Sequence, residues 1–351
     1  MKGLSHVGSL AFAVMLGAIA AAGPAAAQSG GSVADFYRGK TISVYIGSDV
    51  GGGYSVYAHT IWETMPKHIP GNPKAVLLNM PGAGGRKATG YVANVVPKNG
   101  TAIGATQPGA LTESVLGDPK NAQYDARSLG FIGSAESADY LCFARKDAKV
   151  KKFEDLYEHE LLLGADSKGS SFTDNATLMK NVLGVKFKLV KGYKGFRDIS
   201  IALERGEVQG LCGEGWSALM SAGRHLMTDN KINLLVQVAM KGYDEPTKMG
   251  VPMIWKFVKT EEQRQILELA ISQQILGRPY FAPSGLPPER LNALRRAFDA
   301  TMKDPEYIAM AKKQHIEITP ATGEEMTNVI NKIFNAPKDL QAKTRAALFA
   351  S

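Results

Sequence analysis

Short apolar runs alternate along the chain with longer stretches in which apolar residues recur at helical spacing. The apolar runs predict strands at 41–46, 75–79, 102–106, 140–145, 161–165, 186–190, 208–212 and 234–239. The amphipathic stretches predict helices at 56–68, 85–95, 175–183, 196–205, 260–276, 288–315 with a break near Asp304, and 323–334. Strands and helices that alternate in this way are typical of a parallel α/β sheet.

Many of the predicted strands run directly into polar, glycine-rich turns. The turns read GSDVGGGYS after residue 46, NMPGAGGRK after 78, GADSKGSS after 163, KGYKGFRD after 190 and CGEGWS after 211. In open α/β sheets the ligand binds outside the carboxyl ends of the strands, where such turns meet. One set of turns lies early in the chain and one lies in the middle, which predicts two lobes that face one cleft.

Backbone N–H groups and hydroxyls in these turns form a candidate anion site. A junction of strand, glycine and helix directs free N–H groups and the positive end of a helix dipole at one point. Three or four hydrogen bonds to a charged partner, each about 1.5–3 kcal/mol, are enough to hold a carboxylate. Ordinary turns are the alternative for any single cluster. The candidate residues are Gly52, Gly53, Tyr54 and Ser55 in the first turn, Gly82, Ala83, Gly84 and Gly85 in the second, and Ser170 and Ser171 in the middle of the chain.

The first 27 residues predict a secretory signal peptide. Lys2 is followed by an apolar run from Val7 to Ala22 and by a small-residue cleavage site that ends at Ala27. A membrane anchor is the alternative, but the run is short for the roughly 20 apolar residues that a membrane span needs. We therefore expect a secreted protein.

Composition and charge exclude further classes of function. A chain of 351 residues fits two domains, and 44% hydrophobic with 21% charged residues is the content of a soluble globular protein. The formal net charge is +8, but the basic residues are scattered among acidic ones, so no nucleic-acid partner is expected. The histidines are dispersed, and Cys142 and Cys212 have no CxxC or His neighbour, so no metal site is expected.

Signatures of nucleotide binding and of catalysis are missing from the sequence. Both early GxG turns lack the later glycine of a dinucleotide fingerprint, since Val56 and Lys87 stand in its place, and no cofactor is expected. No GxSxG, SxxK or HExxH motif occurs. The carboxyl groups of Asp139, Asp166 and Glu214 offer an acid and a base, but nothing in their spacing selects a pair. An enzymatic activity is therefore not expected.

Five stretches carry a resemblance that covers nearly the whole mature chain. They are DFYRGKTISVYIGSDVGGGYSVYAH, IPGNPKAVLLNMPGAGGRKATGYVAN, PKNGTAIGAT, GYKGFRDISIALERGEVQG and APSGLPPERLNALRRAFDATMKDPEY. With a GGG turn after the first strand and a PGAGG turn after the second, the chain resembles the periplasmic substrate-binding proteins of tripartite tricarboxylate transporters, the Bug-type receptors. The resemblance implies a two-lobed α/β fold of the periplasmic-binding-protein type II, with the ligand cleft between lobes that crossover strands join.

The resemblance also implies where the lobes begin and end. The first lobe would comprise residues 33–135 plus 239–351, and the second lobe would comprise residues 136–238. These bounds follow from the expectation that lobes linked by two strands exchange the chain twice.

Further site residues follow from the family pattern. The loop of the facing lobe would run from Lys168 to Ser171, with Tyr193 and Asp198 in the segment after the next strand. Many members of the family carry Asp where this chain has Ser55. An aspartate there would favour a ligand with an amino or other donor group, so its absence favours plain carboxylates.

The implied topology brings the two cysteines together. The strand that enters the second lobe would lie beside the strand that begins near Val208, which makes Cys142 and Cys212 neighbours. Export to an oxidising compartment permits a disulfide. A pair of buried thiols is the alternative, because free cysteine is among the most buried residue types. The sequence leaves both open.

We interpret the chain as a periplasmic solute-binding receptor. It would capture a small organic carboxylate by Venus-flytrap hinge closure, as a monomer, and deliver it to the permease subunits of a tripartite tricarboxylate transporter. One alternative is a hydrolase-like periplasmic enzyme that uses the same cleft, with an acid and a base near Asp166 and Glu214. Another is a ligand-sensing partner of a membrane receptor. Recognition by backbone N–H groups leaves little side-chain signature, so the sequence does not identify the carboxylate.

Overall fold

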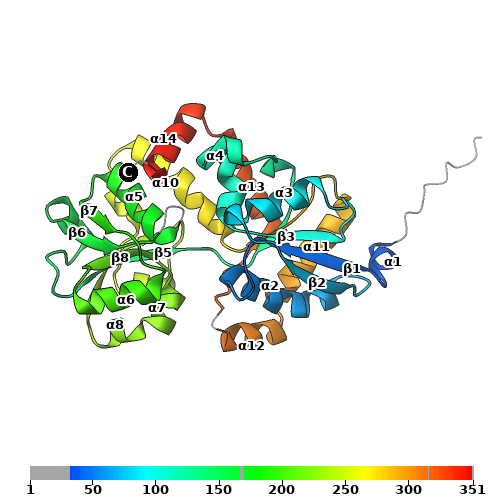
Figure 1. Ribbon diagram of the computed structural model, residues 1–351, viewed down its shortest axis with the longest axis horizontal. Helices are drawn as coiled ribbons and strands as arrows, with labels where there is room; N and C mark the ends of the chain where they lie inside the picture. Colours follow the sequence, from blue (N-terminus) through cyan, green and yellow to red (C-terminus); the bar gives the residue numbers. More distant parts are fainter. Residues whose placement is uncertain (1–31, 167–169, 315, 350–351) are drawn as a thin grey trace, which may run out of the picture.

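Two separate β-sheets organise the chain in a computed structural model, which describes residues 32–166, 170–314 and 316–349. The six-stranded sheet has the order β11-β4-β10-β3-β1-β2, and the five-stranded sheet has the order β7-β6-β8-β5-β9. Figure 1 shows the sheets side by side, each with helices around it. The predicted two-lobed α/β fold is confirmed. The segment expected to be a signal peptide lies outside the described residues.

The six-stranded sheet of the first lobe is parallel on one side and mixed on the other. Strands β2, β1 and β3 run parallel, whereas β10 lies antiparallel between β3 and β4, and β11 pairs antiparallel with β4. The strands are β1 (Thr41–Ile46), β2 (Lys74–Asn79), β3 (Ala102–Ala105), β4 (Gly130–Ser134), β10 (Pro279–Ala282) and β11 (Ala321–Thr322).

The five-stranded sheet of the second lobe is also mixed. Strand β6 runs parallel to β7 and β8, and β5 lies antiparallel between β8 and β9. The expected parallel pairing therefore holds for three strands of each sheet and fails for the others. Strands β5 and β10 are the first strands after the chain has changed lobes, and each runs against its neighbours. The strands are β5 (Tyr140–Arg145), β6 (Leu161–Gly164), β7 (Phe187–Val190), β8 (Gly210–Glu214) and β9 (Ile232–Val238).

Helices surround both sheets. The α-helices are α1 (Val33–Tyr37), α2 (Gly53–Thr64), α3 (Arg86–Asn94), α4 (Pro108–Leu116), α5 (Ser171–Leu183), α6 (Phe196–Arg205), α7 (Trp216–Ala222), α8 (Arg224–Thr228), α9 (Asp244–Lys248), α10 (Glu261–Ser272), α11 (Pro288–Thr301), α12 (Pro305–Lys313), α13 (Gly323–Asn335) and α14 (Lys338–Phe349). Short 3₁₀ turns include η2 (Ala83–Gly85) and η7 (Gln273–Leu276). None of the helices in the described residues has both the length and the apolarity needed to cross a membrane.

Burial follows the sequence pattern of each strand. In β1, Ile42, Val44 and Ile46 alternate with less buried residues and pack in one core cluster with Ile61 of α2. In β8 every residue is buried, as expected for a strand covered on both faces. Full burial of one such aliphatic side chain contributes about 1.5–3 kcal/mol, so these strand cores position the turns at their ends.

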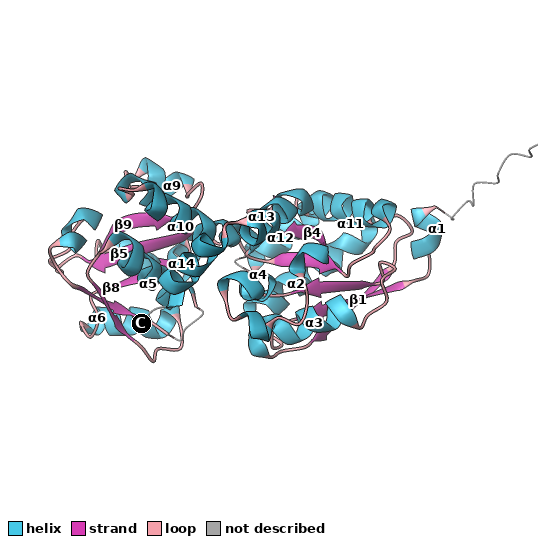
Figure 2. Ribbon diagram, turned by 90° about the horizontal axis from the view of Figure 1, so that it is seen from above, coloured by secondary structure: helices cyan, strands magenta, loops and turns pink. Residues whose placement is uncertain are grey.

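Two helices from the C-terminal part of the chain pack against the second lobe. Helices α10 and α14 both contact α5, as Figure 2 shows from above. The Gln263 amide donates to the carbonyl of Val182 (2.8 Å), and the Asn181 amide donates to that of Ala347 (3.0 Å). Arg345 of α14 donates from Nε to the carbonyl of Val115 in α4 of the first lobe (3.2 Å). Helix α14 thus contacts both lobes, and the lobe bounds predicted above stay a prediction.

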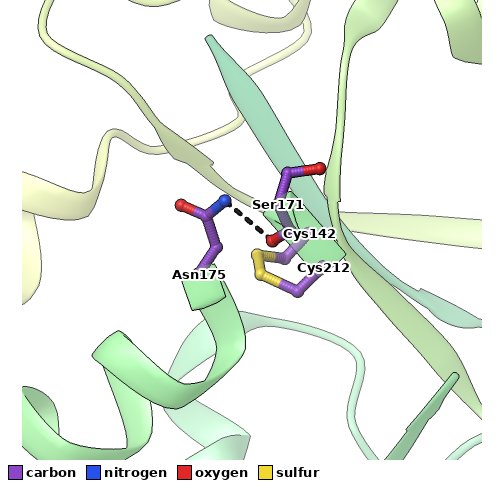
Figure 3. The surroundings of a disulfide bond; sticks show 4 residues. All are labelled: Cys142, Ser171, Asn175 and Cys212. Atoms are coloured by element: carbon purple, nitrogen blue, oxygen red, sulfur yellow. Dashed lines mark hydrogen bonds between the residues drawn. A yellow bond between two sulfur atoms is a disulfide. The ribbon is translucent and has the colours of Figure 1, made fainter. Parts of the chain in front are cut away.

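Cys142 and Cys212 form a disulfide in the second lobe. They are directly opposite each other in the antiparallel pairing of β5 with β8, and both side chains are buried. Figure 3 shows the disulfide beside the first turn of α5, where the Asn175 amide donates to the carbonyl of Ser171 (2.9 Å). The bond therefore joins the strand that enters the lobe to the strand that ends at the cleft.

We predict that the mature protein, denatured without reductant, has no thiol that reacts with a thiol reagent. The same sample has two reactive thiols per chain after reduction. Since the bond closes a loop with a sequence separation of 70 residues, its reduction should lower the free energy of unfolding by about 2–4 kcal/mol. Two reactive thiols before reduction would show that the cysteines are a buried thiol pair.

Candidate functional site

A cleft of about 780 Å³ lies between the lobes. The first lobe lines it with residues of α2, α3 and α4, and the second lobe lines it with the first turns of α5 and the end of β8. The wall also includes residues of the segment 136–140, the end of α10, η7, Arg278, Glu317 and the last residues of α14. The turns that follow β1, β2, β6 and β8 therefore each contribute to this cleft, as predicted, whereas the turn that follows β7 does not line it.

Four of the predicted site residues line the cleft, namely Tyr54, Gly84, Ser170 and Ser171. The others lie behind this lining or away from it: Gly52, Gly53, Ser55, Gly82, Ala83, Gly85, Tyr193 and Asp198. Residues 167–169, which include the predicted Lys168, lie outside the described residues.

An arginine lies beside the first glycine turn. Gly52 is the N-cap of α2 and Gly53 its first residue, and a Cβ at Gly53 would have one near neighbour, Arg278 Nη2 at 3.7 Å. Ser55 is buried, and its hydroxyl accepts a hydrogen bond from the Asn79 amide (3.1 Å). The serine therefore joins the first turn to the end of β2.

The second glycine turn allows three strand ends to approach closely. Gly82, Gly84 and Gly85 all have positive φ, and a Cβ at Gly85 would overlap the side chains of Thr106 and Gln107 beyond β3. The Gln107 amide donates in turn to the carbonyl of Gly47, after β1 (3.1 Å). These glycines pack the turns together, and Gly84 alone of the four predicted residues here reaches the cleft lining.

An ion pair lies where the chain changes lobes. Glu136 stands between β4 and β5, Arg278 directly precedes β10, and Nε of Arg278 lies 3.1 Å from the Glu136 carboxylate. The backbone N–H of Ala135 donates to the carbonyl of Arg278 (3.0 Å), so the two crossing segments are also joined directly. The guanidinium stacks over Tyr54 and Tyr57, 4.4 and 4.8 Å from the ring centres.

Sequence reasoning missed Glu136 and Arg278. The signal for Arg278 is a single charged residue within the run ILGRPYFA, between two apolar stretches. The strand that follows it, β10, has four residues and begins with Pro279, and so it is too short to show a period.

Ser170 is engaged by its own helix. As the N-cap of α5 it accepts a hydrogen bond from the Thr173 N–H (3.4 Å), and its hydroxyl donates to the Asp166 carboxylate. Burial raises the pKa of Asp166. Ser171, the first residue of α5, also lines the cleft.

Glu214 ends strand β8 at the cleft and is 6% exposed. Burial raises the pKa of its carboxyl group to about 8, and burial also raises the pKa of Asp139. The preceding residue, Gly213, has a φ of +104° and lies against the backbone of Ser171 and Phe172. That contact positions Glu214 beside the start of α5.

Carboxyl groups outnumber cations in the described lining of the cleft. Two guanidinium groups are present, and each is near a carboxylate: Arg86 lies 3.4 Å from Glu113, and Arg278 is paired with Glu136. No group of three metal-ligating side chains lies together in the described part of the chain. The acidic lining residues are Glu113, Glu136, Asp139, Asp174, Glu214 and Glu317.

Comparisons with known proteins identify the fold. No protein-family model and no curated protein sequence matches the chain. A solved TctC solute-binding protein from Polaromonas has a TM-score of 0.69 at 18% identity, over 88% of this chain and 99% of that one. The periplasmic binding protein BugD has a TM-score of 0.59 at 18% identity, over 88% and 98%. MatC from Rhodopseudomonas palustris, with bound malate, has a TM-score of 0.56 at 17% identity, over 86% and 99%.

The chain therefore has the fold of the two-lobed solute-binding proteins. The likeness to TctC and BugD extends over 88% of this chain, and it confirms the fold that the resemblance implied.

We predict that the Glu136–Arg278 ion pair stabilises the junction of the lobes. Arg278→Met leaves a largely buried carboxylate without its partner and should lower the free energy of unfolding by about 3 kcal/mol. The double variant with Glu136→Gln should lose less than the sum of the single variants. Denaturant unfolding measures this coupling, and the exposed pair Lys256–Glu154 is the control that should show little. Additive losses at Glu136 and Arg278 would contradict the prediction.

We also predict that Gly213→Ala moves β8 away from α5. The added Cβ would overlap the Ser171 carbonyl at a positive φ, so the variant should lose about 3 kcal/mol of stability. Gly184→Ala, which has a φ of +71° with open space around it, should lose about 1 kcal/mol. Equal melting temperatures for the two variants would show that the close approach at Gly213 is not required.

Proposed function

We propose that the protein is a periplasmic solute-binding receptor that captures a small organic acid by closure of its lobes. One observation carries the proposal: Tyr54 and Gly84 of the first lobe line the same cleft as Ser170 and Ser171 of the second. A ligand that contacts both lobes favours the closed arrangement by its differential binding energy. The similar MatC protein has malate bound, which supports a carboxylate as the ligand class.

The receptor would work outside the cytoplasm as a monomer. The predicted signal peptide supports export to the periplasm, and the Cys142–Cys212 disulfide supports an oxidising compartment. The likeness to TctC and BugD supports delivery to the permease of a tripartite tricarboxylate transporter. A ligand-sensing partner of a membrane receptor would use the same cleft.

The carboxylate would be held by groups of both lobes. Arg278, stacked on Tyr54, stands beside Gly53 and is the cation closest to the first glycine turn. The start of α5 offers the Ser171 hydroxyl and backbone N–H groups at the positive end of a helix dipole. Ser170 would support this site as the helix cap.

An enzyme is the second candidate, because the pKa of Glu214 is raised to about 8, a value that suits a general acid or base. Incubation of the purified protein with its released ligand separates the two functions. A receptor returns the ligand unchanged, whereas a hydrolase converts it.

We predict that denaturation of the purified mature protein releases a small organic acid, which mass spectrometry identifies. Gly53→Val should weaken its binding at least tenfold in calorimetry, because the branched side chain displaces the Arg278 guanidinium. Gly90→Val is the matched control: Gly90 also lies in a helix with its nearest side chain at 3.7 Å, but it does not line the cleft.

Two results would contradict the proposal. One is a released ligand without any acidic group. The other is equal ligand affinity in the wild type and in Gly53→Val, with both folded, which would remove the first glycine turn from the site.

A further inference from the structure

The carboxyl group of Glu214 is buried with one of its oxygen atoms unsatisfied. Oε1 accepts a hydrogen bond from the N–H of Gly215 (3.0 Å). Oε2 has no hydrogen-bond partner within the described residues, although the side chain lines the cleft. A buried polar atom without a partner costs free energy, so this oxygen is suited to a partner that enters the cleft.

No cation of the described chain compensates Glu214. Tyr140 of β5 interacts with it electrostatically, and the Tyr243 hydroxyl, after β9, lies near the adjacent Gly215. Asp139, before β5, and Asp174 of α5, which packs against β8, line the same cleft. All four are neutral or acidic. The Tyr243 hydroxyl is already a donor to the backbone carbonyl of Asp139.

The charge of the whole cleft points in the same direction. The two guanidinium groups that line it among the described residues are both near carboxylates, Arg86 near Glu113 and Arg278 near Glu136, so neither is available to Glu214. A ligand with a cationic end would supply the positive charge that the described residues around Glu214 lack.

We propose that Glu214 binds an ammonium group of the ligand, so that the ligand is an amino-carboxylate and not a plain dicarboxylate. The inference rests on the proposed receptor function and assigns the two ends of its ligand. The carboxylate end belongs with Arg278 and the glycine turns of the first lobe, and the ammonium end donates to Glu214 Oε2. This reverses the expectation drawn from Ser55, because the acidic group stands on the opposite lobe.

The protonation of Glu214 makes the pH dependence of ligand affinity a second test of the proposal. Since burial raises its pKa to about 8, the ligand-free carboxyl group is largely protonated at pH 7. An ammonium group binds the ionised form, so binding releases a proton, and affinity falls by up to tenfold for each pH unit below 8. A neutral Glu214 that donated to a carboxylate would give the opposite sign, with affinity lost above pH 8.

The test compares ligands that differ only at one end. Calorimetry of the mature protein uses 4-aminobutanoate with glutarate and 6-aminohexanoate with pimelate, at pH 6, 7 and 8. The variant Glu214→Gln keeps the shape and removes the charge, and the exposed Glu63→Gln is its control. Melting temperatures verify that both variants are folded, and Glu214→Asp tests whether a shorter carboxylate restores binding if the glutamine variant does not fold.

The proposal expects an amino acid to bind at least tenfold more tightly than its matched dicarboxylate. The variant Glu214→Gln should bind that amino acid at least tenfold more weakly than the wild type does. The affinity of the wild type for the amino acid should fall toward pH 6. A dicarboxylate that binds more tightly, with Glu214→Gln unchanged or improved, overturns the ammonium assignment and leaves the receptor function intact. Failure of both amino acids to bind also overturns it, and the ligand released from the purified protein then decides the receptor function separately.

Discussion

The Glu136–Arg278 ion pair joins the segment between β4 and β5 to the start of β10, at the two places where the chain passes between the lobes. The two residues belong to segments far apart in the sequence, and a backbone hydrogen bond between Ala135 and Arg278 also joins these segments. Gly277 permits this approach, since a Cβ there would lie 2.5 Å from the carbonyl of Glu136. Each lobe is attached to this junction by an interior strand of its sheet, β5 in the second lobe and β10 in the first, and both strands begin at the cleft.

The sequence predicted those parts of the fold that local physics decides. Strands β1 and β5 have the predicted bounds, because each is an apolar run between strong turn signals. Helix α4 was missed, since Pro108 and Gly109 at its start are turn signals, although proline is compatible with a first helical turn. Strand β10 was missed because its four residues are stabilised by β3 and β4 on either side, which no local pattern reports.

The sequence predicted where the candidate site lies better than it predicted which residues line it. Turns from both sheets do meet at the cleft, although the turn after β7 does not line it. Gly85 instead allows close packing behind the cleft, against Thr106 and Gln107. The charged residues Glu136 and Arg278 come together only through the crossing topology. The acidity of the cleft is likewise a tertiary property, in a chain whose formal net charge is +8.

Helix α14 adds a third connection between the lobes, at a distance from the other two along the chain. It packs on α5, bonds to α4 through Arg345, and contributes Leu348 and Phe349 to the wall of the cleft. Two adjacent connections leave lobes free to twist as well as to open, whereas a third removes degrees of freedom. The lobe closure proposed above would therefore shift α14 against at least one of its two neighbours, and a fluorophore attached to this helix would report that closure as a change in its surroundings.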